Sequence, residues 1–408
     1  MKKRIIVSAG GTGGHIIPAL AVCKELLKKE CEVYYIGNEN SMEFDIISRH
    51  NSRDDFQSSQ NIIPFYSINV QKLYRSMTFK HLLFPFKLLK SVIKCIKYIK
   101  KIKPEAFIGF GGFVAGPPAL AAWFCRCPIF LQEQNCRPGL TNRWTGKIAK
   151  VVFLAYEESI KYFKSRKAYV VGNPINVTEV SEFSPWKNIF PAIREGETTK
   201  RLLILGGSQG SLYINNLIWG HLELFRNNNL DLIWQTGNKH LIQIKNELIN
   251  RNYVMKETDD DGQLIFEYES QKVCIFAFTS TIHDIYSISD FVISRGGALS
   301  LAEIELHKIP AFVIPLSTAA VNEQYYNALN MEKRNMGLMF EEKDKTLFNT
   351  KFQDFLEKAP SMYTSASPHH VAFSCEERSN LGVGEEGGGS PNHITAAENI
   401  ANILLECI

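Results

Sequence analysis

The fold is decided by the stretch RIIVSAGGTGGHIIPALAVCKELLKK, which spans residues 4–29. A short β-branched run from Arg4 to Ala9 stops at a cluster of glycines, and apolar residues then recur at helical spacing from Pro18 to Lys29. This order predicts a strand, a glycine turn and a helix. A glycine turn lets the backbone approach an anion closely, and the N-terminus of the next helix contributes N–H groups and partial positive charge. The stretch therefore predicts an anion-binding turn.

The same order of strand, glycine turn and helix returns in the second half of the chain. A strand predicted at Arg201–Leu205 meets the loop Gly206–Gly210, and a helix-like segment begins near Leu212. Further strands are predicted at residues 32–36, 106–109 and 129–132. Strands that alternate with helices predict a parallel sheet. We therefore predict an α/β protein with one Rossmann-like fold in each half.

Length and composition agree with two globular domains. A chain of 408 residues exceeds the ~100–200 residues that are usual for one domain. The fractions of 45% hydrophobic and 22% charged residues, with a net charge of +4, exclude a disordered chain and a generally nucleic-acid-binding surface. We predict an N-terminal domain over residues 1–175, a C-terminal domain over 176–360, a flexible glycine-rich linker over 361–393 and a terminal helix over 394–408.

Cysteine usage and the N-terminus bear on the compartment. The nine cysteines are odd in number, and no two CxxC units stand at the spacing of a zinc site. We therefore expect free thiols in a reducing cytosol. The apolar run from Ile5 to Ala9 is too short for a signal peptide or a membrane span.

A dinucleotide site is the first alternative for the glycine turn, because Rossmann folds bind NAD at this place. The pattern G-x-G-x-x-G would need a third glycine where Ile16 stands. The second predicted strand ends at Gly37-Asn38 without the acidic residue that holds a ribose. The glycine spacing therefore disfavours a dinucleotide oxidoreductase.

A second constellation in the C-terminal half combines small residues with an acid. The segment Arg295–Glu303 follows a strand predicted at Phe291–Ser294 and places Glu303 in the first turns of a helix. A carboxylate there can accept hydrogen bonds from both hydroxyls of a ribose. The alternative is a carboxylate that only complements the helix dipole.

The ordered set of motifs over roughly residues 1–340 is typical of one family. The chain resembles the MurG-type undecaprenyldiphospho-muramoylpentapeptide β-N-acetylglucosaminyltransferases of glycosyltransferase family 28. The motifs that carry the resemblance are residues 10–15 (GGTGGH), 111–117 (GGFVAGP), 133–135 (EQN), 138–142 (PGLTN), 172–174 (GNP), 206–210 (GGSQG), 235–237 (QTG) and 297–303.

The resemblance implies the GT-B fold, in which two Rossmann-like domains with parallel sheets face one another across a cleft. It implies inverting transfer of N-acetylglucosamine from UDP-N-acetylglucosamine to undecaprenyl-diphospho-N-acetylmuramoyl-pentapeptide in peptidoglycan synthesis. We expect no cofactor and no metal, because helix N-termini can stabilise the leaving diphosphate. The run Asp259-Asp260-Asp261 is interpreted as a solvated turn.

The resemblance also implies the site residues. Ser208 and its neighbouring N–H groups would hold the donor diphosphate, the backbone at Thr279 would read uracil, and Glu303 would hold the ribose. The full predicted donor set is Thr12, Gly13, Gly14, Asn135, Ser208, Gln209, Gly210, Thr279, Ala298, Leu299, Glu303 and Gln324. The predicted set for the acceptor diphosphate is Gly11, Thr12, Gly13, Gly14, Gly112 and Gly116.

The reaction needs a base near the acceptor hydroxyl. His15 is the first candidate, because it closes the first glycine loop and its ordinary pKa suits proton transfer near neutrality. The equal alternative is that His15 caps the helix or binds the acceptor phosphate. Glu133 is the second candidate for the base.

Three positions depart from the family pattern. Gln132 stands where a histidine is common, Asn176 where an arginine is common, and Glu323 where a neutral residue or histidine is common. Loss of an arginine near a diphosphate would remove a charge-assisted contact, so these positions bear on substrate affinity.

A basic stretch predicts a membrane-facing surface. Between Asp55 and Glu105 there are ten basic residues and no acidic one. Interleaved apolar residues suit a segment that lies in the interface of an anionic bilayer. We predict membrane contacts at Lys80, Leu82, Leu83, Phe84, Phe86 and Lys87, and a peripheral location on the cytoplasmic face of the inner membrane. The alternative is an amphipathic helix over residues 87–103 whose apolar side faces the core.

Two other functions remain open at this stage. The first is a glycosyltransferase of the same fold that acts on another lipid, such as diacylglycerol. The second is a catalytically silent nucleotide-sugar-binding or membrane scaffold protein, which the departures at Gln132 and Asn176 motivate.

Overall fold

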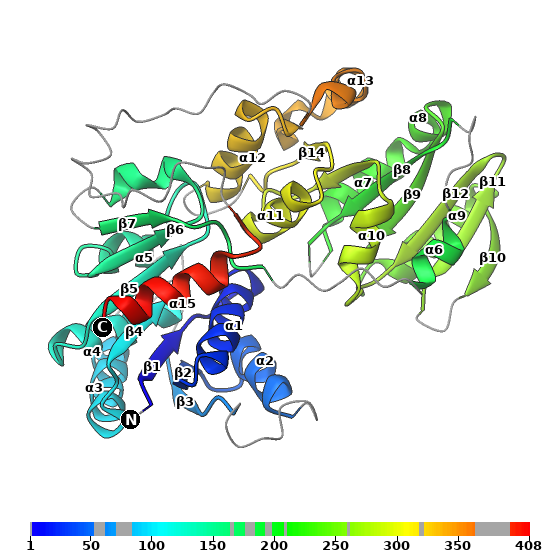
Figure 1. Ribbon diagram of the computed structural model, residues 1–408. Coiled ribbons are helices and arrows are strands. Elements are labelled where there is room, and N and C mark those ends of the chain that lie inside the picture. Colours follow the sequence, from blue (N-terminus) through cyan, green and yellow to red (C-terminus); the bar gives the residue numbers. More distant parts are fainter. Residues whose placement is uncertain are drawn as a thin grey trace. The chain divides into compact units, whose positions relative to one another are not determined.

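The computed structural model describes residues 2–52, 62–70, 84–163, 167–175, 184–191, 198–207, 210–258, 262–317, 322–363 and 392–408. The chain divides into two compact units (Figure 1). Unit 1 comprises Met1–Asn176 and Val371–Ile408, and unit 2 comprises Val177–His370.

Unit 1 is built on a seven-stranded parallel sheet with the order β3-β2-β1-β4-β5-β6-β7. From β1 the chain moves outward to β3, returns to β4 beside β1, and continues to the other edge. The neighbours β1 and β4 therefore form the topological switch point, where ligands of such sheets bind at the carboxyl ends of the strands. The strands are β1 (Arg4–Ser8), β2 (Glu32–Asn38), β3 (Phe65–Ile68), β4 (Ala106–Gly109), β5 (Ile129–Glu133), β6 (Val151–Leu154) and β7 (Lys167–Val170).

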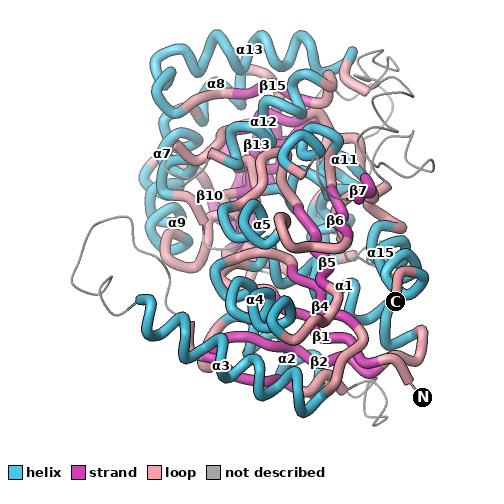
Figure 2. The backbone as a smooth tube through the Cα atoms, turned by 90° about the vertical axis from the view of Figure 1, so that its left-hand side faces the viewer, coloured by secondary structure: helices cyan, strands magenta, loops and turns pink. Residues whose placement is uncertain are grey.

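Helices cover both faces of this sheet (Figure 2). Alternate residues of β1 point to opposite layers: Ile5 and Val7 pack with α1 and α15, whereas Ile6 packs with α3 and α4. The helices are α1 (Gly13–Lys28), α2 (Met42–Asn51), α3 (Phe84–Ile102), α4 (Gly116–Phe124), α5 (Leu140–Thr145) and α15 (Ala396–Glu406), with short 3-10 helices η3 (Phe113–Ala115) and η4 (Glu157–Tyr162).

Helix α15 lies within residues 394–408, the segment predicted as a terminal helix. Its buried residues Ala397, Ile400, Ala401 and Leu404 recur at helical spacing and join the core that α1 covers. The last residues of the chain thus complete the hydrophobic core that the first strand begins.

Unit 2 is built on an eight-stranded sheet with the order β10-β11-β12-β9-β8-β13-β14-β15. From β12 to β15 the neighbours are parallel, as predicted, and the switch point lies between β8 and β13. The strands are β8 (Lys200–Leu205), β9 (Leu230–Gln235), β10 (Val254–Thr258), β11 (Leu264–Tyr268), β12 (Gln271–Phe276), β13 (Phe291–Ser294), β14 (Ala311–Val313) and β15 (Gly337–Met339).

One edge of this sheet differs from the expected parallel arrangement. Strands β10, β11 and β12 pair in antiparallel fashion. The turn from Tyr268 to Gln271 is too short for the crossover that a parallel pair needs, and Glu269 adopts a left-handed conformation with a φ of 53°.

The helices of unit 2 cover its sheet from both sides. They are α6 (Pro185–Ile189), α7 (Leu212–Gly220), α8 (Leu222–Asn227), α9 (Leu241–Asn250), α10 (Ile282–Ile288), α11 (Ala298–Leu306), α12 (Glu323–Lys333) and α13 (Phe348–Lys358), with 3-10 helices η5 (Glu342–Leu347) and η6 (Ala359–Ser361). Alternate residues of β8 again divide between two cores: Leu202 and Ile204 enter one, and Leu203 and Leu205 enter the other.

Candidate functional site

The two glycine loops of unit 1 press against each other at the switch point. Gly11 and Gly112 have φ angles of 90° and 74°. A Cβ atom added at Gly112 would lie 2.0 Å from the carbonyl oxygen of Gly10, and one added at Gly10 would lie 2.6 Å from Val114. Only glycine fits at these positions, so the sequence brings the loops after β1 and β4 into direct contact.

The first loop leads into a helix that suits an anion. Helix α1 begins at Gly13, and within the described residues the side chain of its N-cap residue, Thr12, makes no capping hydrogen bond. There is no acidic residue in the first turn. The start of α1 therefore offers N–H groups and the positive end of the helix dipole to a ligand. Together with Gly112, and with Gly116 at the start of α4, the loop unites the predicted acceptor set on one edge of the sheet.

His15 lies in the first turn of α1 and is half-buried. Its Nδ1 atom is 3.0 Å from Oε1 of Gln134, at the end of β5. The imidazole also lies against the second loop, because a Cβ atom at Gly111 would come within 3.3 Å of the ring. The structure thus places the first candidate base between both glycine loops.

Glu133, the second candidate, lies in a different environment. It is 1% exposed, and its carboxylate accepts hydrogen bonds from the backbone N–H and side-chain amide of Asn135, from the backbone N–H of Gly139 and from the side chain of Asn142. Burial raises the pKa of Glu133, and these hydrogen bonds oppose the rise. The geometry suits a carboxylate that holds the Asn135–Asn142 loop in place.

The glycine loop of unit 2 contacts the residues that follow two strands of the sheet, β9 and β13. A Cβ atom at Gly210 would lie 2.4 Å from the carbonyl oxygen of Thr236. After the loop, Ser211 caps α7 by accepting the N–H of Ile214, and it also accepts a hydrogen bond of 2.7 Å from Arg295. Sequence reasoning gave Arg295 no role, although a cation directly after a buried strand was a visible signal.

Helix α11 presents the other predicted donor residues. It begins at Ala298 after the N-cap Gly297, which has no side chain to accept the first N–H groups. A Cβ atom at Gly296 would lie 2.4 Å from the carbonyl oxygen of Gln324, so α11 and α12 begin side by side. The side chain of Gln324 in turn accepts the N–H of Leu316 at 3.0 Å.

Glu303 lies on α11 and accepts a hydrogen bond of 3.1 Å from the hydroxyl of Tyr286 on α10. Burial raises the pKa of Glu303 to about 7, and the hydrogen bond from Tyr286 opposes this rise. The ring of Tyr286 lies tilted against that of His307, and burial lowers the pKa of His307 to about 4. Sequence reasoning missed Tyr286, which lies on another helix. Thr279 lies in the loop before α10, where its hydroxyl accepts the N–H of Thr281.

Some predicted residues lie outside the described part of the chain, so their placement stays a prediction. These are Ser208, Gln209, Asn176, Lys80, Leu82, Leu83, the side chain of Phe84, the run Asp259-Asp260-Asp261 and most of residues 361–393.

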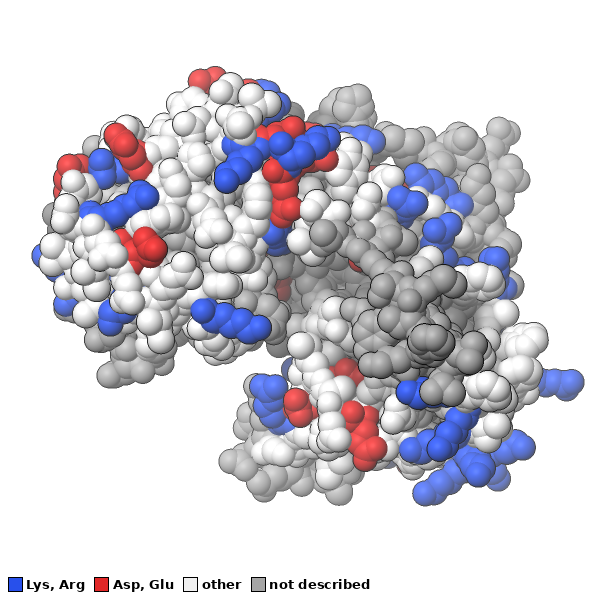
Figure 3. Space-filling view, turned by 180° about the vertical axis from the view of Figure 1, so that it is seen from behind, with Lys and Arg blue, Asp and Glu red and all other residues white. Residues whose placement is uncertain are grey.

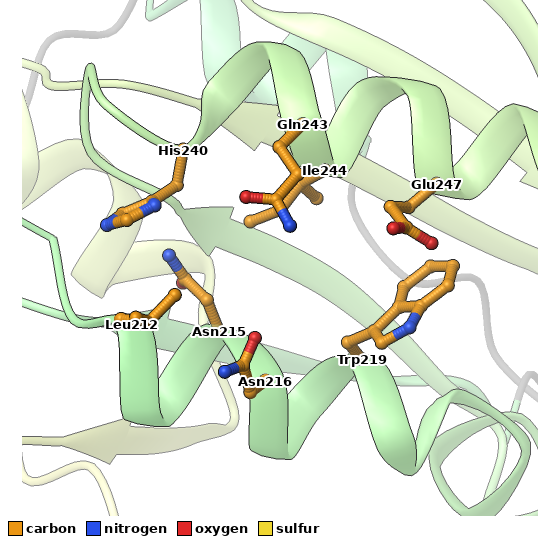
Figure 4. A pocket seen from close by; sticks show the side chains of 8 residues that line it. All are labelled: Leu212, Asn215, Asn216, Trp219, His240, Gln243, Ile244 and Glu247. Carbon is orange, nitrogen blue, oxygen red and sulfur yellow. The ribbon is translucent and has the colours of Figure 1, made fainter.

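Two grooves within unit 2 are too small for a nucleotide sugar. One, between α7 and α9, holds about 20 Å³, and Asn215 at its floor is engaged with Thr236 and Trp234 (Figure 4). The other, lined by residues that include Leu316 and Glu342, holds about 130 Å³. Over the described residues, no group of three or more His, Cys, Asp or Glu lies close enough to hold a metal ion.

Two Rossmann-like units, each with glycine loops at its switch point, define the GT-B class of glycosyltransferases. The model of the glycosyltransferase family 28 N-terminal domain matches residues 5–154, and that of the family 28 C-terminal domain matches residues 201–371. The chain belongs to glycosyltransferase family 28, and it is a glycosyltransferase.

Named relatives extend over most of the chain. A protein of Francisella philomiragia, named UDP-N-acetylglucosamine–N-acetylmuramyl-(pentapeptide) pyrophosphoryl-undecaprenol N-acetylglucosamine transferase, is 36% identical over 85% of this chain and 86% of its own length. A protein of the same name from Bacillus pumilus is 32% identical over 84% of this chain and 87% of its own. The crystal structure of Acinetobacter baumannii MurG has the same fold, with 23% identity, 99% of each chain covered and a TM-score of 0.69.

Proposed function

We propose that this chain transfers N-acetylglucosamine, with inversion, from UDP-N-acetylglucosamine to undecaprenyl-diphospho-N-acetylmuramoyl-pentapeptide. The observation that carries the proposal is identity of 36% over 85% of the chain with a relative named for this transfer. The two switch points support it, because each presents a helix N-terminus and glycine loops to an anion, and the reaction involves two diphosphates.

Unit 2 would bind the donor. The start of α11, with Ala298 and Leu299, and the loop that ends at Gly210 would face the diphosphate and sugar. The carboxylate of Glu303 would accept the ribose hydroxyls, and the backbone near Thr279 would read uracil. Gln324 would contact the sugar, and the resemblance adds Ser208, Gln209 and the unit 1 residue Asn135 to this set.

Unit 1 would bind the acceptor. The loops after β1 and β4 would hold its diphosphate through N–H groups at the start of α1. The acceptor hydroxyl oxygen would attack the anomeric carbon while the bond from that carbon to the β-phosphate oxygen of UDP breaks. His15 would take the hydroxyl proton, and the negative charge would leave on UDP. Glu133 would act on the loop that carries Asn135.

Helix α3 supports attachment to an anionic membrane surface. Its inner face, with Val92, Cys95, Ile99 and Ile102, is buried in the core, as the amphipathic alternative predicts. Near its N-terminus, however, Phe86, Leu89 and Ile93 recur at helical spacing and are 71%, 58% and 47% exposed. Exposed lysines flank them, and basic side chains gather over this part of unit 1 at the lower right of Figure 3. In the described part of the chain, no helix could cross a membrane.

A radiolabelled transfer assay tests the proposal. The full chain is incubated with labelled UDP-N-acetylglucosamine and either the muramoyl lipid or diacylglycerol. We expect label in the muramoyl lipid and stoichiometric release of UDP. Label in diacylglycerol alone would indicate the rival lipid acceptor, and binding of the donor without UDP release would indicate a silent protein.

A further inference from the structure

Three buried amide side chains lead from His15 into the interior of unit 1. Gln134 contacts the imidazole of His15. Its amide contacts that of Gln132 on β5, which in turn contacts the amide of Asn173, after β7. Gln134, Gln132 and Asn173 are 1%, 0% and 0% exposed, so water cannot take the place of a protein hydrogen-bond partner. Their hydrogen bonds therefore determine which way each amide points.

The orientation of Gln134 is set by the backbone. Its Nε2 atom lies 2.8 Å from the carbonyl oxygen of Phe110, which can only accept a hydrogen bond. The opposite end of the amide, Oε1, consequently faces Nδ1 of His15 at 3.0 Å. An amide oxygen also only accepts, so Nδ1 of His15 must carry a hydrogen.

The hydrogen bonds of Asn173 and Gln132 fix the same orientation of the Gln134 amide. The Nδ2 atom of Asn173 lies 3.1 Å from the carbonyl oxygen of Gln134, so its Oδ1 faces Nε2 of Gln132 at 3.4 Å. The Oε1 atom of Gln132 then accepts from Nε2 of Gln134 at 2.5 Å. A flip of any one amide would bring two acceptors or two donors together in a buried place, which is costly.

We infer that Gln134, held by Gln132 and Asn173, is a positioning residue that fixes neutral His15 with its hydrogen on Nδ1 and its lone pair on Nε2. A neutral imidazole has one donor nitrogen and one acceptor nitrogen. The proton of the acceptor hydroxyl can therefore pass to Nε2, whereas the opposite tautomer would present an N–H there. The inference rests on the proposed function, in which His15 is the base.

The same arrangement serves the ring after proton transfer. In the imidazolium both nitrogens donate, and Oε1 of Gln134 still accepts from Nδ1. The partner therefore need not reorganise as charge develops on the ring.

The test reads the tautomer directly. In the full chain labelled with ¹⁵N-histidine, NMR should show neutral His15 protonated at Nδ1, with the signal assigned by its loss in His15→Ala. Gln134→Leu should abolish this preference and lower kcat by ~10–100-fold, while KM for UDP-N-acetylglucosamine changes less than ~3-fold. Gln134→Met keeps the length of the side chain but offers no amide oxygen to the imidazolium, so the acid limb of the pH profile of kcat/KM should move to lower pH.

A matched control separates this role from general stability. Ser91→Ala removes another buried hydrogen bond of unit 1, from the hydroxyl to the carbonyl oxygen of Asn69. It should leave the His15 tautomer and the pH profile unchanged. Wild-type His15 protonated at Nε2, or a Gln134→Leu chain with the wild-type tautomer and pH profile, overturns the inference.

The outcomes distinguish this inference from the proposed function. A wild-type chain without transferase activity would refute the function, whereas the NMR measurement reports the tautomer regardless of activity. If Gln134→Leu does not fold, the wild-type tautomer and the pH profile of Gln134→Met decide the question.

Discussion

The switch points of the two units use the same backbone design with different side chains. In unit 1 the loops after β1 and β4 touch through backbone, since Gly112 lies over the carbonyl of Gly10. In unit 2 the loops after β8 and β13 are joined by a side chain, since Arg295 donates to Ser211. Among the described residues, the N-cap residues of α1 and α11 make no side-chain capping hydrogen bond. The comparison teaches that the sheet topology brings the glycine loops together, and that the side chains on the following helix distinguish the two switch points.

Helices α1 and α11 carry functional side chains of different chemistry. Helix α1 carries His15, whose ring is held by a neutral amide, and α11 carries Glu303, whose carboxylate is held by a tyrosine hydroxyl. The first group suits proton transfer and the second suits recognition of hydroxyls. Five experiments test the comparison of the two units, from the largest expected effect to the smallest.

Removal of the imidazole should affect turnover and spare donor binding. We expect His15→Ala to lower kcat by ~100-fold or more, because general base catalysis contributes about that much. The affinity for UDP-N-acetylglucosamine, measured by calorimetry, should stay within ~3-fold of wild type. Turnover within a few-fold of wild type would exclude His15 as the base and erase the proposed difference between the units.

The backbone contact in unit 1 should be indispensable for stability. A methyl group at Gly112 meets a carbonyl oxygen at 2.0 Å in a left-handed conformation, so Gly112→Ala should cost about 2–4 kcal/mol in the free energy of unfolding. Gly14→Ala is the control, because its nearest neighbour would lie 3.6 Å away. Denaturant unfolding of both variants checks the prediction, and equal midpoints would contradict it.

Donor binding should depend on pH through Glu303. Because the proposed role of the Glu303 carboxylate is to accept ribose hydroxyls, the affinity for UDP should fall as the pH drops below about 7, by up to ~10-fold per pH unit. Calorimetric titration from pH 5.5 to 8.5 measures this. Glu303→Gln should bind weakly with no such dependence. Tyr286→Phe removes a hydrogen bond to the charged form, so its transition should move to higher pH.

The same group gives a linkage prediction for stability. The pKa of Glu303 is raised from 4.5 to about 7 in the folded chain, so the folded state favours the protonated form. Its contribution is fully present below about pH 4.5 and is lost as the pH rises through about 7. The difference in unfolding free energy between Glu303→Gln and wild type should therefore shift in favour of the glutamine variant over this window. A constant difference would contradict the raised pKa.

The smallest expected effect concerns the membrane. Phe86→Ser with Leu89→Ser should weaken binding to vesicles of anionic lipid by ~10-fold, and added salt should weaken it further. Ile242→Ser removes an equally exposed apolar side chain, 72% exposed, from unit 2 and should change nothing. Vesicle sedimentation measures binding of the wild type, the double variant and the Ile242→Ser control. If the control lost as much binding as the double variant, membrane attachment could not be assigned to unit 1.

The central strands could be predicted because each is a continuous apolar run between turn signals. Runs at residues 4–9, 106–109 and 291–294 became β1, β4 and β13, buried on both faces as parallel strands are. The antiparallel edge at β10 and β11 escaped prediction. On β10 the apolar residues Val254 and Met255 are both exposed, so this strand shows no alternation, although β11 is buried at Leu264, Ile265 and Phe266.

Less of the site than of the fold could be predicted. The glycine loops have a local signature, because their short contacts exclude any other residue. The amide chain has none: His15 and Gln134 are 119 positions apart, and only the register of β5 beside β4 brings them together. The assigned roles of the individual site residues stay predictions until the variants are measured.

The docking of α15 on α1 has a consequence for how the protein is made. Lys3 donates to the carbonyl of Leu405, so the segment before β1 contacts α15 across unit 1. During synthesis, every residue of unit 2 leaves the ribosome before α15 does. Unit 2 can thus mature while unit 1 still exposes the apolar side of α1, and unit 1 completes its hydrophobic core only after α15 has emerged.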